Sequence, residues 1–290
     1  TFVSFEIVNL FYNLSLFKIG KKNSTGALSN LGWASGYLGG LTSLFIVFIL
    51  IKFSNESLAI FNISIFLFIG PFVALWSALF GFSLFKEMKT VKFKSPNILE
   101  LAKNIKSKRI SNFLISYFFF NNAIVSIFAF ASMIAAFIFG LSESEILFLG
   151  VFINFFGIIG CLIIGNFEDR VGSLNAVKIC VIGLLSLTVI LFFTKSYYSF
   201  WLVALLIGFF IGPIQASSRS FLSKNINSQN QMGAFSLYSM FGNLCSILGP
   251  FLVGLVIELT ESIRLGIIVI PIFLFLSLIP FIKLYFRSNV

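Results

Sequence analysis

Long apolar runs alternate with short polar segments along almost the whole chain. Each of these runs is long enough, at 1.5 Å per residue, to cross about 30 Å of hydrocarbon as an α-helix. A membrane β-barrel would instead show alternating segments of about ten residues. We therefore predict eight spanning helices, at residues 24–51, 58–85, 112–139, 145–167, 175–194, 199–220, 234–258 and 265–286. A shorter apolar stretch that ends near Phe17 is interpreted as the end of a further span.

One long polar segment, residues 86–109, divides the apolar runs into two blocks. It is rich in Lys and Arg and contains only Glu87 and Glu100 as acidic residues. Basic loops of this kind stay on the cytoplasmic side of a bilayer. The alternatives are a nucleic-acid-binding segment or a disordered tail, but a basic segment flanked by spanning runs is far more often juxtamembrane. We therefore interpret residues 86–111 as a cytoplasmic linker and expect no nucleic-acid partner.

The remaining charges agree with a chain that crosses the membrane once per run. All 20 basic residues except Lys52, Lys195 and Arg264 then fall on the side of the linker. A missed or extra span would scramble this asymmetry, which follows the positive-inside rule at every loop. The C-terminus is therefore predicted to be cytoplasmic.

Composition indicates an integral membrane protein and removes most enzyme chemistry. Hydrophobic residues make up 58% of the chain and charged residues 10%, far from the usual balance of soluble domains. The chain has no His, and its three Cys lie at irregular spacing in apolar runs. Because no disulfide framework, metal-ligand spacing or polar catalytic cluster is visible, we expect no cofactor, no metal site and no enzyme activity.

Two helical blocks joined by a long linker are typical of transporters built from two halves that rock about a central site. Six runs follow the linker, enough for one complete half at residues 112–290. Residues 1–85 hold only two full runs and a partial one, so we interpret them as the end of an N-terminally truncated half. The expected fold class is an all-α polytopic transmembrane bundle.

The polar loop after the 145–167 run has the sequence GNFEDRVGSLNAVK. It resembles the major facilitator signature G-x-x-x-D-R-x-G, which lies at a cytoplasmic turn within each half of those transporters. The matching residues are Gly165, Asp169, Arg170, Gly172 and Lys178. Gly165 permits close helix approach, Asp169 can pair with or cap a helix end, and Gly172 suits a tight turn. An ordinary charged loop with a turn glycine is the alternative, since Ser173 and Leu174 stand where basic residues are common.

Residues 9–40 and 208–250 carry a longer resemblance. They are similar to the vacuole-effluxer family of major facilitators, which comprises the autophagy-related amino-acid exporters and their bacterial relatives. The shared positions are Tyr12, Asn13, Gly32, Trp33, Gly36, Tyr37, Gly39, Gly40, Gly212, Gln215, Ala216, Ser218, Arg219, Ser220, Leu237, Tyr238, Gly249 and Pro250. The resemblance implies a major facilitator fold, amino acids or another small solute as cargo, and the bacterial inner membrane as location.

This sequence departs from that family at two interior positions. Asn122 and Ala123 stand where bacterial relatives have Asp-Gly, and Asn243 stands where Lys is common. A coupling proton or cation is a further partner expected of such a transporter. Both changes remove charge, so this coupling is in doubt here.

Polar side chains inside the predicted spans are the candidates for a transport cavity, because such groups are expensive in lipid and usually face a cavity or another helix. The predicted cavity set is Glu6, Asn9, Asn13, Asn122, Ser126, Asn154, Gln215 and Asn243. Hydrogen bonding between helices is the alternative role for each Asn. Glu6 is the strongest candidate, since a carboxylate costs more near the bilayer centre.

The sequence thus predicts a secondary active transporter that moves a small solute by alternating access. The gating residues are expected to be Gly165, Asp169, Arg170, Gly172 and Arg219. The alternative is a sensor or assembly scaffold that uses the same fold without transport, because fold does not fix function. A membrane-embedded enzyme ranks third.

Overall fold

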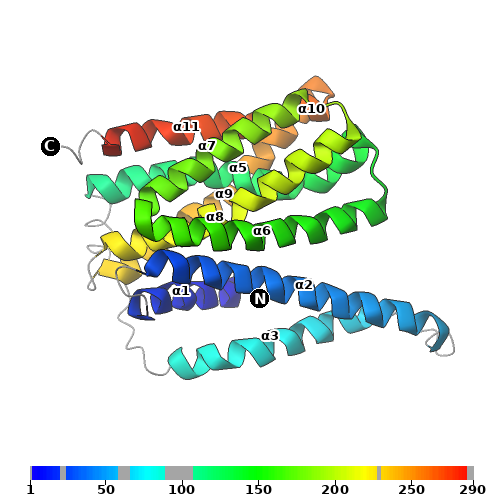
Figure 1. The fold of residues 1–290 in the computed structure, drawn as a ribbon, viewed down its shortest axis with the longest axis horizontal. Helices are drawn as coiled ribbons and strands as arrows, with labels where there is room; N and C mark the ends of the chain where they lie inside the picture. The colour runs from blue at the N-terminus through cyan, green and yellow to red at the C-terminus, as the bar shows by residue number, and fades with distance from the viewer. Residues whose placement is uncertain (1, 20–23, 58–65, 89–106, 227–229, 286–290) are drawn as a thin grey trace.

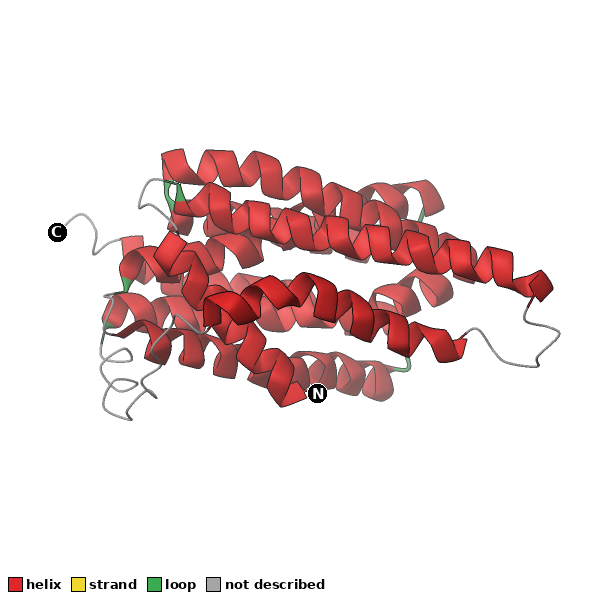
Figure 2. Cartoon of the chain, turned by 90° about the horizontal axis from the view of Figure 1, so that it is seen from below, coloured by secondary structure: helices red, strands yellow, loops and turns green. Residues whose placement is uncertain are grey.

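The computed structural model describes residues 2–19, 24–57, 66–88, 107–226 and 230–285. These residues are helical apart from short turns and contain no strand (Figure 2). The helices are α1 (Phe2–Ile19), α2 (Thr25–Ser57), α3 (Phe66–Met88), α5 (Lys108–Phe139), α6 (Glu143–Val171), α7 (Ser173–Phe193), α8 (Tyr197–Asn225), α9 (Gln231–Thr260), α10 (Ile263–Gly266) and α11 (Val269–Tyr285). The all-α class predicted from the apolar runs is confirmed.

Local sequence signals end and begin several of these helices. Gly140, with φ of 69°, ends α5, and Gly172, with φ of 88°, separates α6 from α7. A side chain is strained at positive φ, so glycine is the natural residue at both reversals. The tight turn expected at Gly172 is therefore present. Between α5 and α6, Ser142 and Glu145 form a capping box that satisfies the first turn of α6.

Six helical stretches within the described residues are long and apolar enough to cross a membrane, and they are the six predicted after the linker. They are α5 to α9 and the stretch Ile263–Ile282, which a turn divides into α10 and α11. Helices α2 and α3 form at the two earlier predicted runs, but their described parts are not among the six. Much of residues 86–111, from 89 to 106, lies outside the described residues.

We call α1 to α3 the first block and α5 to α11 the second block. In Figure 1 the second block forms one bundle, and the first block lies along one side of it. Within the second block, glycines allow α6 and α8 to pack closely against each other. A Cβ on Gly160 would strike the backbone of Phe209, and one on Gly208 would lie 2.9 Å from Ile153. The blocks meet chiefly where α2 packs on α6 and α8.

Helix direction alternates along the chain as the charge asymmetry predicts. The C-terminal ends of α1, α3, α6, α8 and α11 and the N-terminal ends of α2, α5 and α7 lie at the same end of the molecule, on the left in Figure 1. The described helix ends that flank the predicted basic loops therefore share one end. Which side of the membrane this end faces remains a prediction from the Lys/Arg rule.

Labelling of introduced cysteines tests that orientation. Arg170 and Tyr198 are exposed at opposite ends of the second block, and the native cysteines are buried. A membrane-impermeant maleimide applied outside intact cells should label Tyr198→Cys and leave Arg170→Cys unmodified until the membrane is opened. Labelling of both residues from the same side would contradict the predicted topology.

Candidate functional site

The first turn of α2 meets the last turn of α6. Asp169 on α6 accepts hydrogen bonds from the backbone N–H of Gly26 and of Ala27, each at 2.9 Å, through different carboxylate oxygens. The first N–H groups of a helix have no partner within the helix, and the helix dipole favours an anion there. A carboxylate of the second block therefore caps a helix of the first block.

Glycines allow this approach on both helices. A Cβ on Gly26 would lie 2.7 Å from the Asp169 carboxylate and equally close to that of Glu168. A Cβ on Gly165 would lie 2.6 Å from the side chain of Asn30. Gly165 thus lies at the close α6–α2 approach expected from the sequence.

Glu168 is fully buried beside this cap. One of its carboxylate oxygens accepts hydrogen bonds from the Asn30 amide at 3.0 Å and from the Ser217 hydroxyl at 2.6 Å. Lys224 on α8 lies 3.7 Å from the other oxygen and 3.1 Å from Asp169. A buried carboxylate is tolerated only when it is paired and hydrogen-bonded, and Glu168 is both.

Arg219 on α8 also contacts the first block. Its guanidinium donates to the Asn13 side-chain oxygen at 3.3 Å and to the carbonyl and hydroxyl oxygens of Ser29 at 3.2 and 3.3 Å. Its central carbon lies 4.8 Å from the ring centre of Tyr12 and 5.4 Å from that of Trp33. Both distances suit cation–π attraction.

We call Glu168, Asp169, Arg219 and Lys224, with their partners on α1 and α2, the interblock contact. It lies where the last turn of α6 and the end of α8 meet the first turns of α2. Hydrogen bonds of polar side chains cross between the blocks, whereas the ion pairs of Lys224 lie within the second block. Water can replace the crossing hydrogen bonds if the blocks separate. The arrangement can therefore hold this end closed without fixing it permanently.

The expected gating residues are not all in the interblock contact. Asp169, Arg219 and Gly165 are part of it or lie at its edge, and Gly172 forms the turn that follows Asp169. Arg170 is exposed, and the structure shows it in no hydrogen bond or ion pair with the described residues. Its role in gating remains a prediction.

Sequence reasoning missed Glu168 because the signature leaves its position open. Its partners Asn30 and Ser217 are 138 and 49 residues away along the chain. The one signal in the sequence was an acidic residue at the end of an apolar run, directly before the signature Asp. Among the described residues, no group of three or more His, Cys, Asp or Glu side chains could hold a metal ion.

Two members of the predicted cavity set lie between α5 and α9. Asn122 is fully buried and donates to the carbonyl oxygen of Phe118 at 2.7 Å and to the sulfur of Cys245 at 3.2 Å. Ser126, also fully buried, donates to the carbonyl oxygen of Asn122 at 2.8 Å. In this conformation both side chains serve helix packing.

The other predicted cavity residues are distributed over α1, α6, α8 and α9. Asn13 is buried against Arg219, and Asn154 is half-buried and donates to the Gly150 carbonyl oxygen at 2.8 Å. Half-buried positions are also found for Asn9, Gln215 and Asn243. The side chain of Glu6 lies outside the described residues, although its backbone is part of α1. The cavity assignment therefore remains a prediction.

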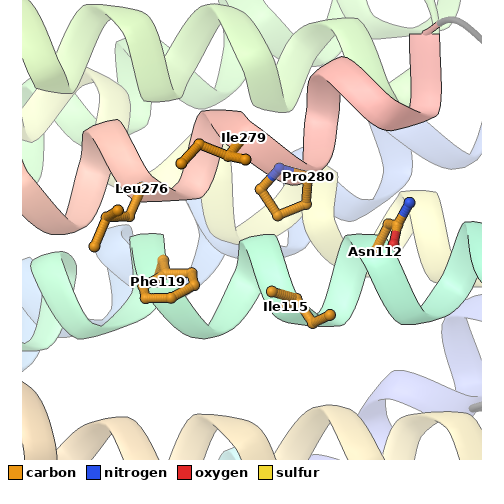
Figure 3. Close-up of a pocket in the computed structure, with 6 residues that line it drawn as sticks. All are labelled: Asn112, Ile115, Phe119, Leu276, Ile279 and Pro280. Atoms are coloured by element: carbon orange, nitrogen blue, oxygen red, sulfur yellow. The ribbon is translucent and has the colours of Figure 1, made fainter.

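A pocket of about 220 Å³ lies between α5 and α11 (Figure 3). It is lined by Asn112, Ile115, Phe119, Leu276, Ile279 and Pro280. Asn112 is the polar side chain in this lining. The pocket contains no member of the predicted cavity set, so it does not identify a solute site.

Comparison with known proteins identifies related sequences. The family described as "Vacuole effluxer Atg22 like" matches residues 18–289 of the chain. An MFS-type transporter of Bacillus subtilis, YxiO, described as uncharacterized, is 23% identical over 270 residues, which cover 89% of this chain and 63% of the relative. Autophagy-related protein 22 of Vanderwaltozyma polyspora is 27% identical over 194 residues, 60% of this chain and 37% of that relative. The chain thus spans less than two thirds of these relatives.

Solved structures with a similar fold include that of a transporter. It is the crystal structure of a bacterial homologue of the iron transporter ferroportin in an outward-facing state. The TM-score is 0.57 at 13% sequence identity, and the match covers 96% of this chain and 89% of the other. At this identity the likeness concerns the fold alone, which is that of a major facilitator-like transporter. The similar proteins are transporters and effluxers and not enzymes.

Substitution of Gly26 tests whether the interblock contact controls the separation of the blocks. Gly26→Ala places a methyl group against the ends of two carboxylates, which can move aside, so the fold should persist while the cap of α2 is lost. Loss of charge-assisted hydrogen bonds, worth about 1.5–3 kcal/mol each, should shift the equilibrium at least about tenfold towards separated blocks. Spin labels at the exposed positions Leu31 and Asn175 measure this as a longer distance.

Gly36→Ala on the same helix is the matched control, because a Cβ added at Gly36 would have nothing within 4 Å. It should leave the label distance unchanged. An equal response to the two substitutions would mean that helix propensity, and not the cap, sets the distance.

Proposed function

Because the chain belongs to the Atg22-like vacuole effluxer family, we propose that it works as a secondary transporter that moves a small solute across a membrane by alternating access. The observation that carries the proposal is the interblock contact, in which Asp169 of one block caps α2 of the other. Alternating access requires two blocks that separate at one end and then at the other. A contact made of polar groups at one end supplies the closed state of that end.

The energetics of the interblock contact suit a reversible step. Hydrogen bonds to charged groups contribute about 1.5–3 kcal/mol each, and a conformational equilibrium responds to ligands only if its states differ by a few kcal/mol. On opening, water can solvate the N–H groups of Gly26 and Ala27 together with the Asp169 carboxylate. Packing inside the second block, such as Gly160 against Phe209, has no need to change.

The membrane and the orientation follow from the charge pattern. We place the basic end, with the C-terminus, in the cytoplasm of a bacterial cell and the protein in its inner membrane. The Bacillus subtilis relative supports the bacterial location. The structure then corresponds to a conformation closed towards the cytoplasm. The family description as effluxers supports export as the direction.

Amino acids are the first solutes to test, because the sequence resembles amino-acid exporters at positions such as Tyr12, Gln215 and Arg219. A membrane sensor or assembly scaffold is the alternative function, and Asn122 and Asn243 favour it by replacing charged groups expected in coupled relatives. Uptake into liposomes by the full-length protein, screened over amino acids with and without an ion gradient, discriminates the two. Absence of flux for every solute would favour the scaffold.

Asp169→Asn tests the cap. The amide retains an oxygen acceptor but loses the charge that attracts the α2 dipole and Lys224, so we expect transport to fall about tenfold or more. Protein abundance in the membrane should be unchanged, because partly exposed ion pairs add little to stability. Flux and abundance are measured on the same membranes.

Glu258→Gln, which also neutralises one carboxylate, is the control, since Glu258 is exposed on α9 and outside the interblock contact. It should retain wild-type flux. If Asp169→Asn reduces abundance and flux equally, Asp169 has a structural role only.

Glu6 is the proposed carrier of a coupling proton or cation. Glu6 belongs to α1 and is predicted to lie near the bilayer centre. A carboxylate there must be protonated or must reach water or a cation. Glu6→Gln keeps the shape but cannot ionise, so it should abolish gradient-driven accumulation of solute while solute exchange persists. Glu143→Gln, exposed at the start of α6, serves as the control. Accumulation by Glu6→Gln at the wild-type rate would exclude Glu6 as the carrier.

A further inference from the structure

Arg219 has a buried positive charge with neutral partners. Its residue is 5% exposed, and its hydrogen bonds go to the amide oxygen of Asn13 and to two oxygens of Ser29. Among the described residues no carboxylate forms an ion pair with it, and its Nε has no hydrogen-bond partner. The nearby carboxylates Glu168 and Asp169 pair with Lys224 instead. A buried guanidinium without an anion is costly, so this arrangement needs an explanation.

The side-chain partners of Arg219 come from the first block. Tyr12 and Asn13 belong to α1, and Ser29 and Trp33 belong to α2, whereas Arg219 belongs to α8. Separation of the blocks at this end would therefore remove its hydrogen bonds and its aromatic contacts together. The guanidinium would then remain on α8 at the wall of the opened passage, with its N–H donors unpaired.

A second polar side chain lies on α8 one turn nearer to the middle of the helix than Arg219. Gln215 precedes Arg219 by four residues and lies on the same helix face. It is half-buried, and the structure shows no hydrogen bond from its side chain to the described residues. Arg219 and Gln215 are thus two polar side chains, one helical turn apart, between the end of the bundle and its interior.

We propose that, when this end opens, Arg219 binds the carboxylate of the transported solute. A guanidinium presents two parallel N–H groups that match the two oxygens of a carboxylate, and such bidentate bonds are among the strongest in proteins. The ligand class is therefore small solutes with a free carboxylate. The proposal rests on the proposed function, because it requires that this end opens to a solute.

This exchange of partners also links binding to the movement of the blocks. A ligand shifts a conformational equilibrium only by its difference in affinity for the two states. The carboxylate competes with Asn13 and Ser29 for the same N–H donors, so it binds the open state and stabilises it. When the solute moves from Arg219 past Gln215 towards the interior, Asn13 and Ser29 regain the guanidinium and the end closes behind it.

The test compares amino acids with matched amines that lack the carboxylate, on transporter that keeps Arg219. Full-length protein with spin labels at positions 31 and 175 is mixed with leucine, leucinamide or isopentylamine, and the same set is repeated for alanine and its analogues. The free amino acid should increase the population with separated blocks, and the amide and the amine should not. Inorganic phosphate and acetate are further arms, which distinguish a free oxyanion from the carboxylate of an organic solute.

Variants of Arg219 identify the residue. Arg219→Lys keeps the charge but loses the two parallel N–H groups of the guanidinium. The apparent affinity for the amino acid should therefore fall at least about tenfold. Arg219→Gln should abolish the response to the amino acid. Lys224→Gln is the comparison: it weakens the interblock contact, and so raises the separated population, but it should retain the preference for acid over amide. Melting temperatures verify that each variant is folded.

The outcomes separate this proposal from the proposed function. Equal responses to leucine and leucinamide, or a response to phosphate alone, would overturn the carboxylate site even if liposome flux is observed. Acid-selective responses without flux for any solute would support the site and contradict the transport function. A preference for acids that persists in Arg219→Gln would place the carboxylate site on another residue.

Discussion

The contact between the two blocks depends on the N-terminus of α2, which is capped by a residue of the other block. The first N–H groups of α2 need acceptors, and Asp169 on α6 supplies them at 2.9 Å. Gly26 and Gly165 make room for the approach, and the reversal at Gly172 ends α6 just after the capping residue. Because the cap comes from another block and not from the residues next to α2, the helix can lose it without unfolding. Under the proposed alternating access, solvent would replace the carboxylate when this end opens.

Contacts inside the second block differ from those at the interblock contact. Inside the second block, helices meet through glycines and aromatic rings, such as Gly160 against Phe209 and Phe113 stacked on Phe221 at 4.2 Å. Close packing of this kind resists deformation. Between the blocks, Tyr37 also packs closely on glycines of α6 and α8, but Asp169 and Arg219 reach α1 and α2 through hydrogen bonds that water can replace. The proposed alternating access would exchange these hydrogen bonds while each block keeps its internal packing.

The sequence specified the helices more completely than the contacts between them. Run lengths placed the helices, charge asymmetry placed their ends, and the signature identified Gly165, Asp169 and Gly172. Glu168 was missed because its partners come from helices distant in sequence, and helical periodicity does not say which faces meet. The position of a residue along a helix likewise gives its depth in the membrane but not the direction in which its side chain points. Asn122 lies near the middle of α5, and the structure shows its side chain buried against α9.

Glu168 and Asp169 are adjacent, yet the structure gives them different physical tasks. Asp169 is partly exposed and binds backbone N–H groups, which any acceptor of suitable position satisfies. Glu168 is fully buried, and its charge is tolerated because Ser217 and Lys224 of α8 and Asn30 of α2 face it. Ser217 and Lys224 belong to the same block as Glu168, so only the hydrogen bond from Asn30 depends on the position of the first block. Under the proposed alternating access, Asp169 supplies attraction between the blocks, and Glu168 favours the alignment of α2 on α6 that brings Asn30 to its carboxylate.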